Sequence, residues 1–192
     1  MKYFIDVVLL FFALPLFLFF YPIISLLILI FDGTPILYSQ LRVGLYGNEF
    51  KLYKFRTMSI LSDDSVHQNH YENLSENKKI EPSLTPDNPI RIENDDRITK
   101  VGNILRKTSL DELPNIINVL FGNMSFVGPR PLVKYESDLY GKYLEERNSV
   151  KPGITGLAQI QGRLDLSLQE RLYWDLQLSL IHISEPTRQW QI

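Results

Sequence analysis

The N-terminal part of the chain is a long apolar segment. Residues Val7 to Phe31 include no charged side chain, and a helix of that length would extend about 37 Å, enough to cross a bilayer core of about 30 Å. A cleaved signal peptide would have a shorter apolar core followed by a small-residue cleavage site. The pattern therefore predicts that residues 1–32 anchor the protein to a membrane.

Two prolines bear on whether this helix spans the membrane. Pro15 and Pro22 each remove a backbone donor, which membrane helices tolerate better than soluble ones. A break near Pro22, with Ser25 bonding a freed carbonyl, favours a re-entrant helix that enters and leaves on one face; a single span is the alternative. One basic residue, Lys2, precedes the apolar run, and several follow it closely: Arg42, Lys51, Lys54 and Arg56. The positive-inside tendency therefore places the rest of the chain on the cytoplasmic face.

The segment 34–58 has the pattern of a β-hairpin. Two aromatic-rich runs flank a glycine-bearing bend at residues 44–48, as in paired strands. Lys54 and Arg56 share one face of the second run and Phe55 the other. That basic face is either a solvated strand surface or a platform for phosphate or anionic lipid heads.

The remainder alternates polar and amphipathic segments. Residues 62–96 are polar and rich in proline, which indicates a surface loop, and His67 and His70 within it lack the further ligands of a metal site. The apolar residues of 113–121 recur at helical spacing, and Gly122 is placed to end that helix. Residues 132–144 form a second, tyrosine-rich amphipathic segment, which either packs on the core or lies in the lipid headgroup layer.

Composition limits the classes of protein to consider. With 192 residues and 22.4 kDa, the chain has room for one domain with a core besides its anchor. It has no cysteine, which excludes disulfides and thiolate metal sites. We expect an α+β fold, in which a re-entrant membrane helix is joined to a small helix-rich domain, residues 33–177, with a β-hairpin and interfacial amphipathic helices.

Adjacent acids are candidates for chemistry. Asp111 and Glu112 precede the helix of residues 113–121, and either Asp111 is its N-cap, with Pro114 in the first turn, or Ser109 and Glu112 form a capping box. Both place carboxylates where backbone donors also favour phosphate. Such a pair can supply a nucleophile and a Mg²⁺ ligand, although many acids at helix starts serve only as caps.

Arg130 strengthens the phosphate interpretation. Pro129 and Pro131 fix φ on both sides of it and Gly128 allows a tight turn, so its guanidinium is presented in a narrow range of directions. A pre-aimed fork suits phosphate oxygens, and a plain surface turn is the alternative. A second stiff turn, Lys-Pro-Gly-Ile-Thr-Gly at 151–156, precedes Gln159 and Arg163.

Several separated motifs in one order resemble the bacterial sugar transferases, monotopic phosphoglycosyl transferases. The resemblance covers residues 40–44 with Gly47, 54–58, 96–102, Leu105 with Arg106, 108–131 and 151–163. It implies transfer of a sugar-1-phosphate from a UDP-sugar to polyprenyl phosphate at the inner membrane, with release of UMP, as the first membrane step of a surface polysaccharide such as capsule or lipopolysaccharide. Membrane lipid is an implied partner and nucleic acid is not.

The resemblance also implies roles for individual residues. Asp111 would attack the β-phosphorus and carry the phosphosugar, and Glu112 would help hold Mg²⁺ or handle the acceptor's proton, so that both acids are metal-ligand candidates. Arg130 would steady the phosphates. Lys54, Arg56 and Arg163 are further candidates for phosphate or nucleotide contact. These roles agree with a charge-neutralising, covalent route for phosphoryl transfer.

The sequence departs from the family at two places. Leu164 stands where the family commonly has asparagine, and residues 178–192 resemble a translated sequencing adapter, so we exclude that tail from functional reasoning. The alternative to the enzyme is a non-catalytic, membrane-anchored binding or scaffold homologue, inactive because its C-terminus is truncated. A single-span anchor carrying an unrelated hydrolase lacks any Ser-His-Asp or metal-ligand cluster in support.

Overall fold

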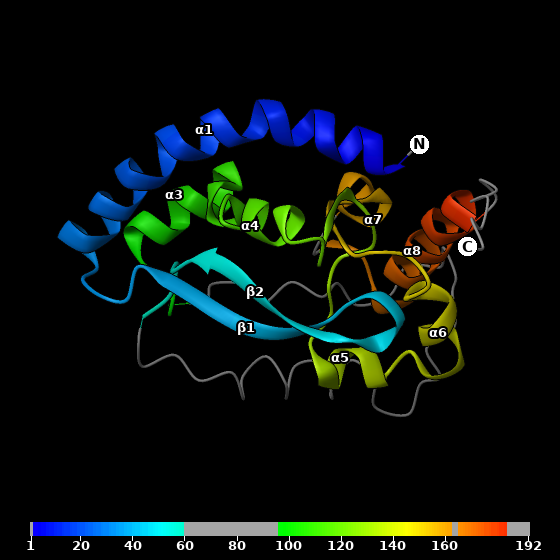
Figure 1. The fold of residues 1–192 in the computed structure, drawn as a ribbon. Helices are drawn as coiled ribbons and strands as arrows, with labels where there is room; N and C mark the ends of the chain where they lie inside the picture. Colours follow the sequence, from blue (N-terminus) through cyan, green and yellow to red (C-terminus); the bar gives the residue numbers. More distant parts are fainter. Residues whose placement is uncertain (1, 60–95, 163–164, 184–192) are drawn as a thin grey trace.

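The structure, a computed structural model, describes residues 2–59, 96–162 and 165–183. Figure 1 shows one long helix arching over a smaller body of short helices and two-stranded sheets. The helices are α1 (Lys2–Phe31), α3 (Lys100–Thr108), α4 (Asn115–Leu120), α5 (Lys134–Asp138), α6 (Leu144–Arg147), α7 (Leu157–Gln161) and α8 (Leu168–Ile183). The strands are β1 (Leu37–Val43), β2 (Glu49–Phe55), β3 (Ser125–Val127) and β4 (Gly153–Thr155), and the 3₁₀ turns are η1 (Leu45–Gly47), η2 (Leu110–Glu112) and η3 (Gly141–Tyr143). The predicted α+β fold with an N-terminal apolar helix is confirmed.

The predicted hairpin is the main sheet. β1 and β2 pair antiparallel, with Leu37 opposite Phe55 and Val43 opposite Glu49. Gly47 has a φ of 81° in the connecting turn, a conformation in which glycine is free of strain. The Val43 amide also donates to the Leu132 carbonyl, which ties the hairpin to the segment after β3.

α1 differs in detail from the expected helix. Pro15 and Pro22 both lie inside one continuous helix, which bends smoothly in Figure 1. The expected break near Pro22 is therefore wrong, and the Ser25 hydroxyl bonds no carbonyl, since it has no hydrogen-bond partner in the described part of the chain.

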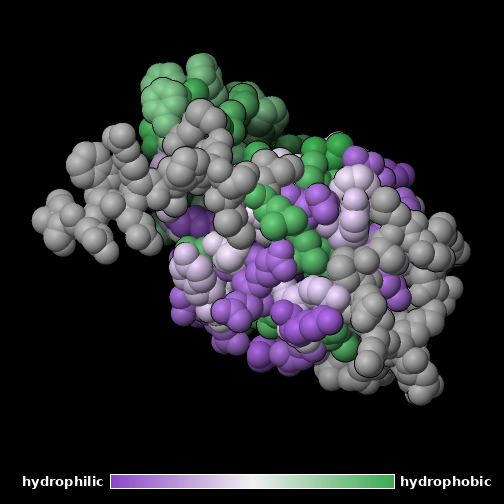
Figure 2. Space-filling model, turned by 90° about the vertical axis from the view of Figure 1, so that its right-hand side faces the viewer, coloured by the Kyte–Doolittle hydropathy of each residue, from purple (hydrophilic) through white to green (hydrophobic). Residues whose placement is uncertain are grey.

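By length and composition α1 could cross a membrane. Ile24 and Ile28 pack on Phe55, while most of the other large apolar side chains of α1 are exposed. Figure 2 shows these hydrophobic residues gathered at the top of the molecule.

Polar contacts fix both ends of α1 to the same body. Near the N-terminus, the Asp6 carboxylate accepts from the Ser125 hydroxyl at 2.9 Å and from the Phe126 amide at 3.0 Å. At the other end is a cluster that we call the helix anchor, formed by Asp32, Gly33, Arg56 and Thr99. There the Arg56 guanidinium donates to the carbonyls of Asp32 and Gly33, at 2.5 and 2.8 Å, and the Thr99 hydroxyl donates to the Asp32 carboxylate at 2.8 Å.

The tyrosine-rich segment 132–144 is not one helix. α5 is followed by η3 and α6, and Gly141 interrupts the helical path with a φ of 49°. Tyr140 is fully buried in a cluster with leucines of the same segment and of α8, namely Leu132, Leu168, Leu172 and Leu176. Of the two roles considered for this segment, the structure shows core packing.

A second sheet brings the two stiff turns together. β3 and β4 pair in parallel, with Ser125 opposite Gly153. The backbones then pass so closely that a Cβ on Gly153 would lie 2.1 Å from the Gly128 nitrogen. Only glycine permits that approach. The proline turn that contains Arg130 is thereby stacked on the turn at residues 151–156.

Candidate functional site

The adjacent acids occupy a 3₁₀ turn between two helices. Ser109 ends α3 in the left-handed conformation, η2 holds Asp111 and Glu112, and Pro114 is the N-cap of α4 without a capping side chain. Neither predicted cap is formed: Asp111 is not the N-cap, and the Ser109 side chain makes no capping bond to this turn. Because the helix backbone does not need them as caps, both carboxylates are available for other contacts.

Glu112 is held by two cations from distant parts of the chain. Its Oε1 accepts from Lys54 Nζ at 2.7 Å and from Arg130 Nη1 at 3.1 Å. Burial alone would raise the pKa of Glu112, but the charges of Arg130 and Lys54 outweigh that effect and lower the pKa to about 2. Glu112 is therefore a fixed anion at neutral pH.

Asp111 is in a different state from its neighbour. Within the part of the chain that the structure describes, its carboxylate forms no hydrogen bond or ion pair. Burial raises its pKa, and Glu112 adds to the rise, although the charges of Lys54, Arg106 and Arg130 oppose it. We call Asp111, Glu112, Lys54 and Arg130 the carboxylate pocket. It pairs one engaged carboxylate with one free carboxylate, a separation of environments typical of different chemical roles.

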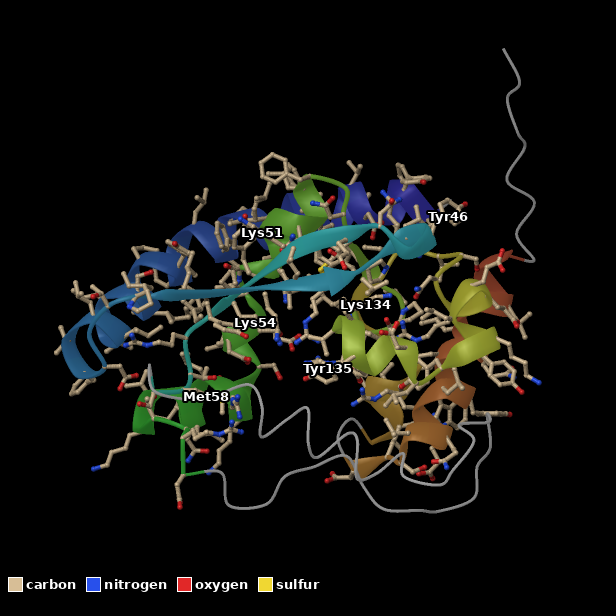
Figure 3. All side chains as sticks on the ribbon, turned by 90° about the horizontal axis from the view of Figure 1, so that it is seen from below. Tyr46, Lys51, Lys54, Met58, Lys134 and Tyr135 are labelled. Atoms are coloured by element: carbon tan, nitrogen blue, oxygen red, sulfur yellow. The ribbon has the colours of Figure 1, made fainter. Side chains whose placement is uncertain are left out.

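Lys54 is the basic residue of β2 that reaches this pocket. Figure 3 shows it between the hairpin and the green helical segment that follows α3. Burial and the nearby Arg130 charge lower its pKa to about 8, although Glu112 and Asp111 oppose the shift. Its side chain is 16% exposed. Of the two alternatives left open for this strand face, the solvated surface is therefore wrong at Lys54, whose side chain is largely shielded from solvent beside Glu112.

Every carbonyl of the turn around Arg130 accepts a long-range hydrogen bond. The donors are Gly153 N to Pro129 O, 2.9 Å; Arg147 Nη2 to Arg130 O, 2.6 Å; Arg42 Nη1 to Pro131 O, 3.1 Å; and Val43 N to Leu132 O, 2.8 Å. The prolines have no amide hydrogen to contribute, so these four carbonyls hold the turn in place. Arg130 is thus presented from a fixed backbone, as its flanking prolines predict.

Two polar residues near the pocket were not among the predicted site residues. Arg42 and Asn115 line a cavity of about 10 Å³ together with Lys54, Glu112 and Arg130. The buried Arg42 Nε and Asn115 Oδ1 have no hydrogen-bond partner among the described residues. A space of this size holds about one water molecule. Their position inside two of the motifs, residues 40–44 and 108–131, was the available signal, but the sequence pattern does not show that they face the acids.

Of the other predicted phosphate contacts, the structure describes only Arg56, and it places that residue away from the carboxylate pocket. Arg56 is committed to the helix anchor, where it bonds backbone carbonyls at the end of α1. Arg163, like His67 and His70, lies outside the described residues. The structure therefore brings together Asp111, Glu112, Lys54 and Arg130, and it directs Arg56 to a different contact.

The two acids suit a shared metal ion better than a protein-only metal site. In the described ranges, no group of three or more His, Asp or Glu side chains could hold a metal. Asp111 and Glu112 supply two carboxylates, and Mg²⁺ is commonly held by one or two carboxylates with substrate phosphates and water. The two carboxylates therefore fit a Mg²⁺ ion whose coordination a bound diphosphate would complete.

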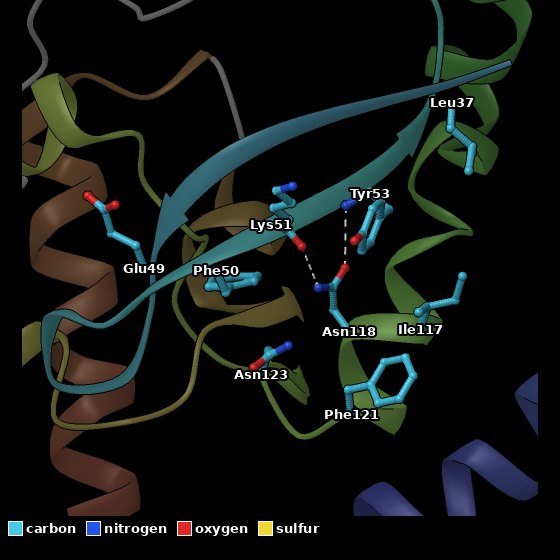
Figure 4. Close-up of a pocket in the computed structure, with 9 residues that line it drawn as sticks. All are labelled: Leu37, Glu49, Phe50, Lys51, Tyr53, Ile117, Asn118, Phe121 and Asn123. Atoms are coloured by element: carbon cyan, nitrogen blue, oxygen red, sulfur yellow. Dashed lines mark hydrogen bonds between the residues drawn. The ribbon is translucent and has the colours of Figure 1, made fainter. Parts of the chain in front are cut away.

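A larger hollow is separate from the carboxylate pocket, because none of the four pocket residues lines it. It has a volume of about 440 Å³ and lies between β2 and α4, as Figure 4 shows. Asn118 bridges its two walls, because its side chain donates to the Lys51 carbonyl at 2.7 Å and accepts from the Tyr53 amide at 3.3 Å. Phe121, expected on the buried face of its helix, is 75% exposed at this hollow.

Comparison with known proteins identifies similar sequences along nearly the whole chain. The model of the family described as "Bacterial sugar transferase" matches residues 1–181. The chain is 41% identical over 157 residues to a UDP-galactose-lipid carrier transferase of Erwinia amylovora, covering 79% of this chain and 31% of the relative. It is 42% identical over 144 residues to an undecaprenyl-phosphate galactose phosphotransferase of Salmonella typhimurium, covering 75% and 29%. It is 40% identical over 173 residues to the exopolysaccharide production protein ExoY of Rhizobium meliloti, covering 85% and 68%. The chain thus spans about a third of the length of the first two relatives.

Proposed function

Because the chain belongs to the bacterial sugar transferase family, we propose that it is a phosphoglycosyl transferase. It transfers a sugar-1-phosphate from a UDP-sugar to polyprenyl phosphate and releases UMP. The relatives named for transfer to lipid carriers or to undecaprenyl phosphate support the reaction class. The observation that carries the proposal is the free carboxylate of Asp111 beside a Glu112 that two cations engage.

In the first step, an Asp111 carboxylate oxygen forms a bond to the β-phosphorus of the donor. The bond between that phosphorus and the bridging oxygen breaks, and UMP leaves with the electron pair. Asp111 suits this role because its raised pKa makes it the more basic and more nucleophilic acid of the two. The guanidinium of Arg130 and the ammonium of Lys54 face the same pocket and stabilise charge on the transferring phosphoryl group.

In the second step, an oxygen of polyprenyl phosphate attacks the same phosphorus and displaces the Asp111 carboxylate. One site thus serves a soluble donor and a lipid acceptor in turn. Of the two roles expected for Glu112, we favour holding cations, because a carboxylate with a pKa of about 2 is a poor proton carrier at neutral pH. A Mg²⁺ ion held by Asp111, Glu112 and the diphosphate would supply charge neutralisation.

We also propose that α1 enters and leaves the membrane on the face that carries the domain. Asp6 near one end and Asp32 at the other both contact the same body, which supports a re-entrant course over a span. The positive-inside tendency favours the cytoplasmic face. Since the chain has no cysteine, Lys2→Cys gives a single labelling site. It should react with an impermeant maleimide only in inside-out vesicles, and labelling of intact spheroplasts would contradict the proposal.

The reaction is tested by UMP release in detergent or nanodiscs. A panel of UDP-sugars is supplied with polyprenyl phosphate and Mg²⁺, and Asp111→Asn is the control. At least one sugar should give UMP and a sugar-diphosphate lipid, whereas Asp111→Asn should lose both products and the covalent phosphosugar adduct. UDP-sugar binding without UMP release for any sugar would favour the non-catalytic scaffold. UMP release that persists in Asp111→Asn would reject Asp111 as the nucleophile.

A further inference from the structure

Behind the carboxylate pocket, a buried ion pair connects α8 to the main chain of Arg130. Arg147, the last residue of α6, donates through Nη2 to the Arg130 carbonyl at 2.6 Å and to Asp175 Oδ2 at 2.7 Å. Its Nε donates to the same Asp175 oxygen at 2.9 Å. Both side chains are almost completely buried. Contacts therefore run without interruption from α8 through Arg147 and the backbone of Arg130 to Glu112.

The geometry suits a guanidinium and no other basic side chain. Arg147 bonds a carboxylate and a backbone carbonyl at the same time, which uses the width of its planar fork, whereas a lysine ammonium is a point donor on a flexible stem. A buried ion pair is weak evidence for a stabilising role, because desolvation can cancel the attraction between the charges. Asp175 also keeps a buried Oδ1 without a partner among the described residues. The ion pair is more easily explained by its second contact, which holds the backbone carbonyl of Arg130 in place.

We propose that Arg147 and Asp175 are positioning residues for sugar-phosphate transfer and act through the carbonyl of Arg130. The inference rests on the proposed function, in which the Arg130 guanidinium steadies the transferring phosphates. Neither neighbouring proline can donate a backbone hydrogen bond. Hydrogen bonds to the carbonyls of this turn therefore decide where the Arg130 side chain points. A displacement of about 1 Å in a group that stabilises a transition state can cost on the order of 100-fold in rate.

The test is a double-mutant cycle with the full chain in nanodiscs. Arg147→Lys should lower kcat by about 10- to 100-fold and change KM for the donor less than about threefold. In an Arg130→Ala background the same substitution should have an effect below about twofold, because the residue through which it acts is gone.

Arg171, which lies on α8 as Asp175 does, provides a matched control for Arg147. It is as buried as Arg147 and pairs with a buried carboxylate, Glu136 of α5. Arg171→Lys keeps the charge and should reduce thermal stability with an effect on kcat that is the same in both backgrounds. Asp175→Asn is a milder second variant at the proposed pair, since its amide oxygen can still accept from Arg147, and we expect about a 3- to 10-fold loss that also vanishes without Arg130.

The outcomes separate this inference from the proposed function. Equal losses from Arg147→Lys in the two backgrounds, or no loss of kcat, would overturn the positioning role alone. If Arg130→Ala itself transferred sugar phosphate normally, the proposed role of Arg130 would fail and the positioning role with it. Failure of both Arg147→Lys and Asp175→Asn to fold would make the pair a structural element and would equally overturn the inference.

Discussion

Lys54 lies near the end of β2 and Arg56 directly follows that strand, yet the two residues belong to separate regions. Lys54 belongs to the carboxylate pocket, where it binds the side chain of Glu112. Arg56 belongs to the helix anchor, where it binds backbone carbonyls just beyond α1. In the first region a cation faces an ionised acid beside a free carboxylate, and in the second a cation faces the negative end of a helix dipole.

The two regions thus have different tasks: the carboxylate pocket is suited to catalysis, and the helix anchor attaches α1 to the domain. The carboxylate pocket concentrates charges of both signs around Asp111, whose carboxylate has no hydrogen-bond or ion-pair partner among the described residues. In the helix anchor, Arg56 Nη2 and the Thr99 hydroxyl bond two backbone carbonyls and the Asp32 carboxylate, which docks α1 on the domain and presents no unengaged nucleophile there. We therefore expect substitutions in the first region to change the rate of transfer and substitutions in the second to change stability.

The largest effect is expected at Glu112. Glu112→Gln removes the negative charge that holds both Lys54 and Arg130, so both cations keep at most a neutral acceptor in place of their common counter-ion. We expect transfer to fall by about 1,000-fold, on the scale of losing several contacts to a developing charge. UMP release measures the rate, and Glu145→Gln on the exposed side of α6 is the control. A loss below tenfold would show that the pocket does not depend on Glu112.

A contrasting pair of substitutions tests the division between the regions. Lys54→Met should lower kcat by about 100-fold, since one charge-stabilising group is lost, and should leave the melting temperature nearly unchanged. Arg56→Met should cost about 2 kcal/mol of stability, because two charged hydrogen bonds to carbonyls are lost. Its kcat per folded molecule should stay within about threefold. Exchanged results, with Arg56 controlling rate and Lys54 controlling stability, would contradict the division.

Much of the fold follows from local patterns. The hairpin, the helix before Gly122 and the long apolar helix are each set by spacing and turn residues that are adjacent in the sequence. The break expected at Pro22 is absent, because a membrane-type helix can continue past a proline. The single helix expected at residues 132–144 is divided where Gly141 takes a positive φ. Local patterns thus predicted which elements exist better than where they end.

The site was predictable only in part, for a physical reason. Asp111, Glu112 and Arg130 lie in motifs whose residue types indicate phosphate chemistry. The alternation of side chains along the strand placed Lys54 and Arg56 on one face, but it could not show that the two residues bind different partners. Arg147 reaches the Arg130 carbonyl from α6, and Asp175 of α8 accepts from Arg147, contacts that tertiary packing alone fixes. Their roles therefore had no counterpart in the sequence pattern.

The pocket also predicts a pH dependence. The pKa of Lys54 is lowered to about 8, so its charge is present below that pH and is lost above it. Transfer should therefore be level near pH 7 and fall toward tenfold per unit as the pH rises well above 8. Lys54→Arg stays cationic, so any transfer that it retains should lack this decline. The same alkaline decline in Lys54→Arg would assign the titration to another group.

The smallest effect is expected where α1 meets the domain at its N-terminal end. Asp6→Asn keeps one acceptor oxygen but removes the charge that strengthens its bonds to Ser125 and Phe126. Bonds to a charged acceptor exceed neutral ones by about 1 kcal/mol, so thermal unfolding in detergent should shift by a few degrees, with kcat unchanged. Asp32→Asn at the helix anchor is the matched substitution for the other end and should give a similar shift. If only Asp32→Asn destabilised the protein, the N-terminal end of α1 would not be docked on the domain, and attachment at a single end would leave room for a spanning helix.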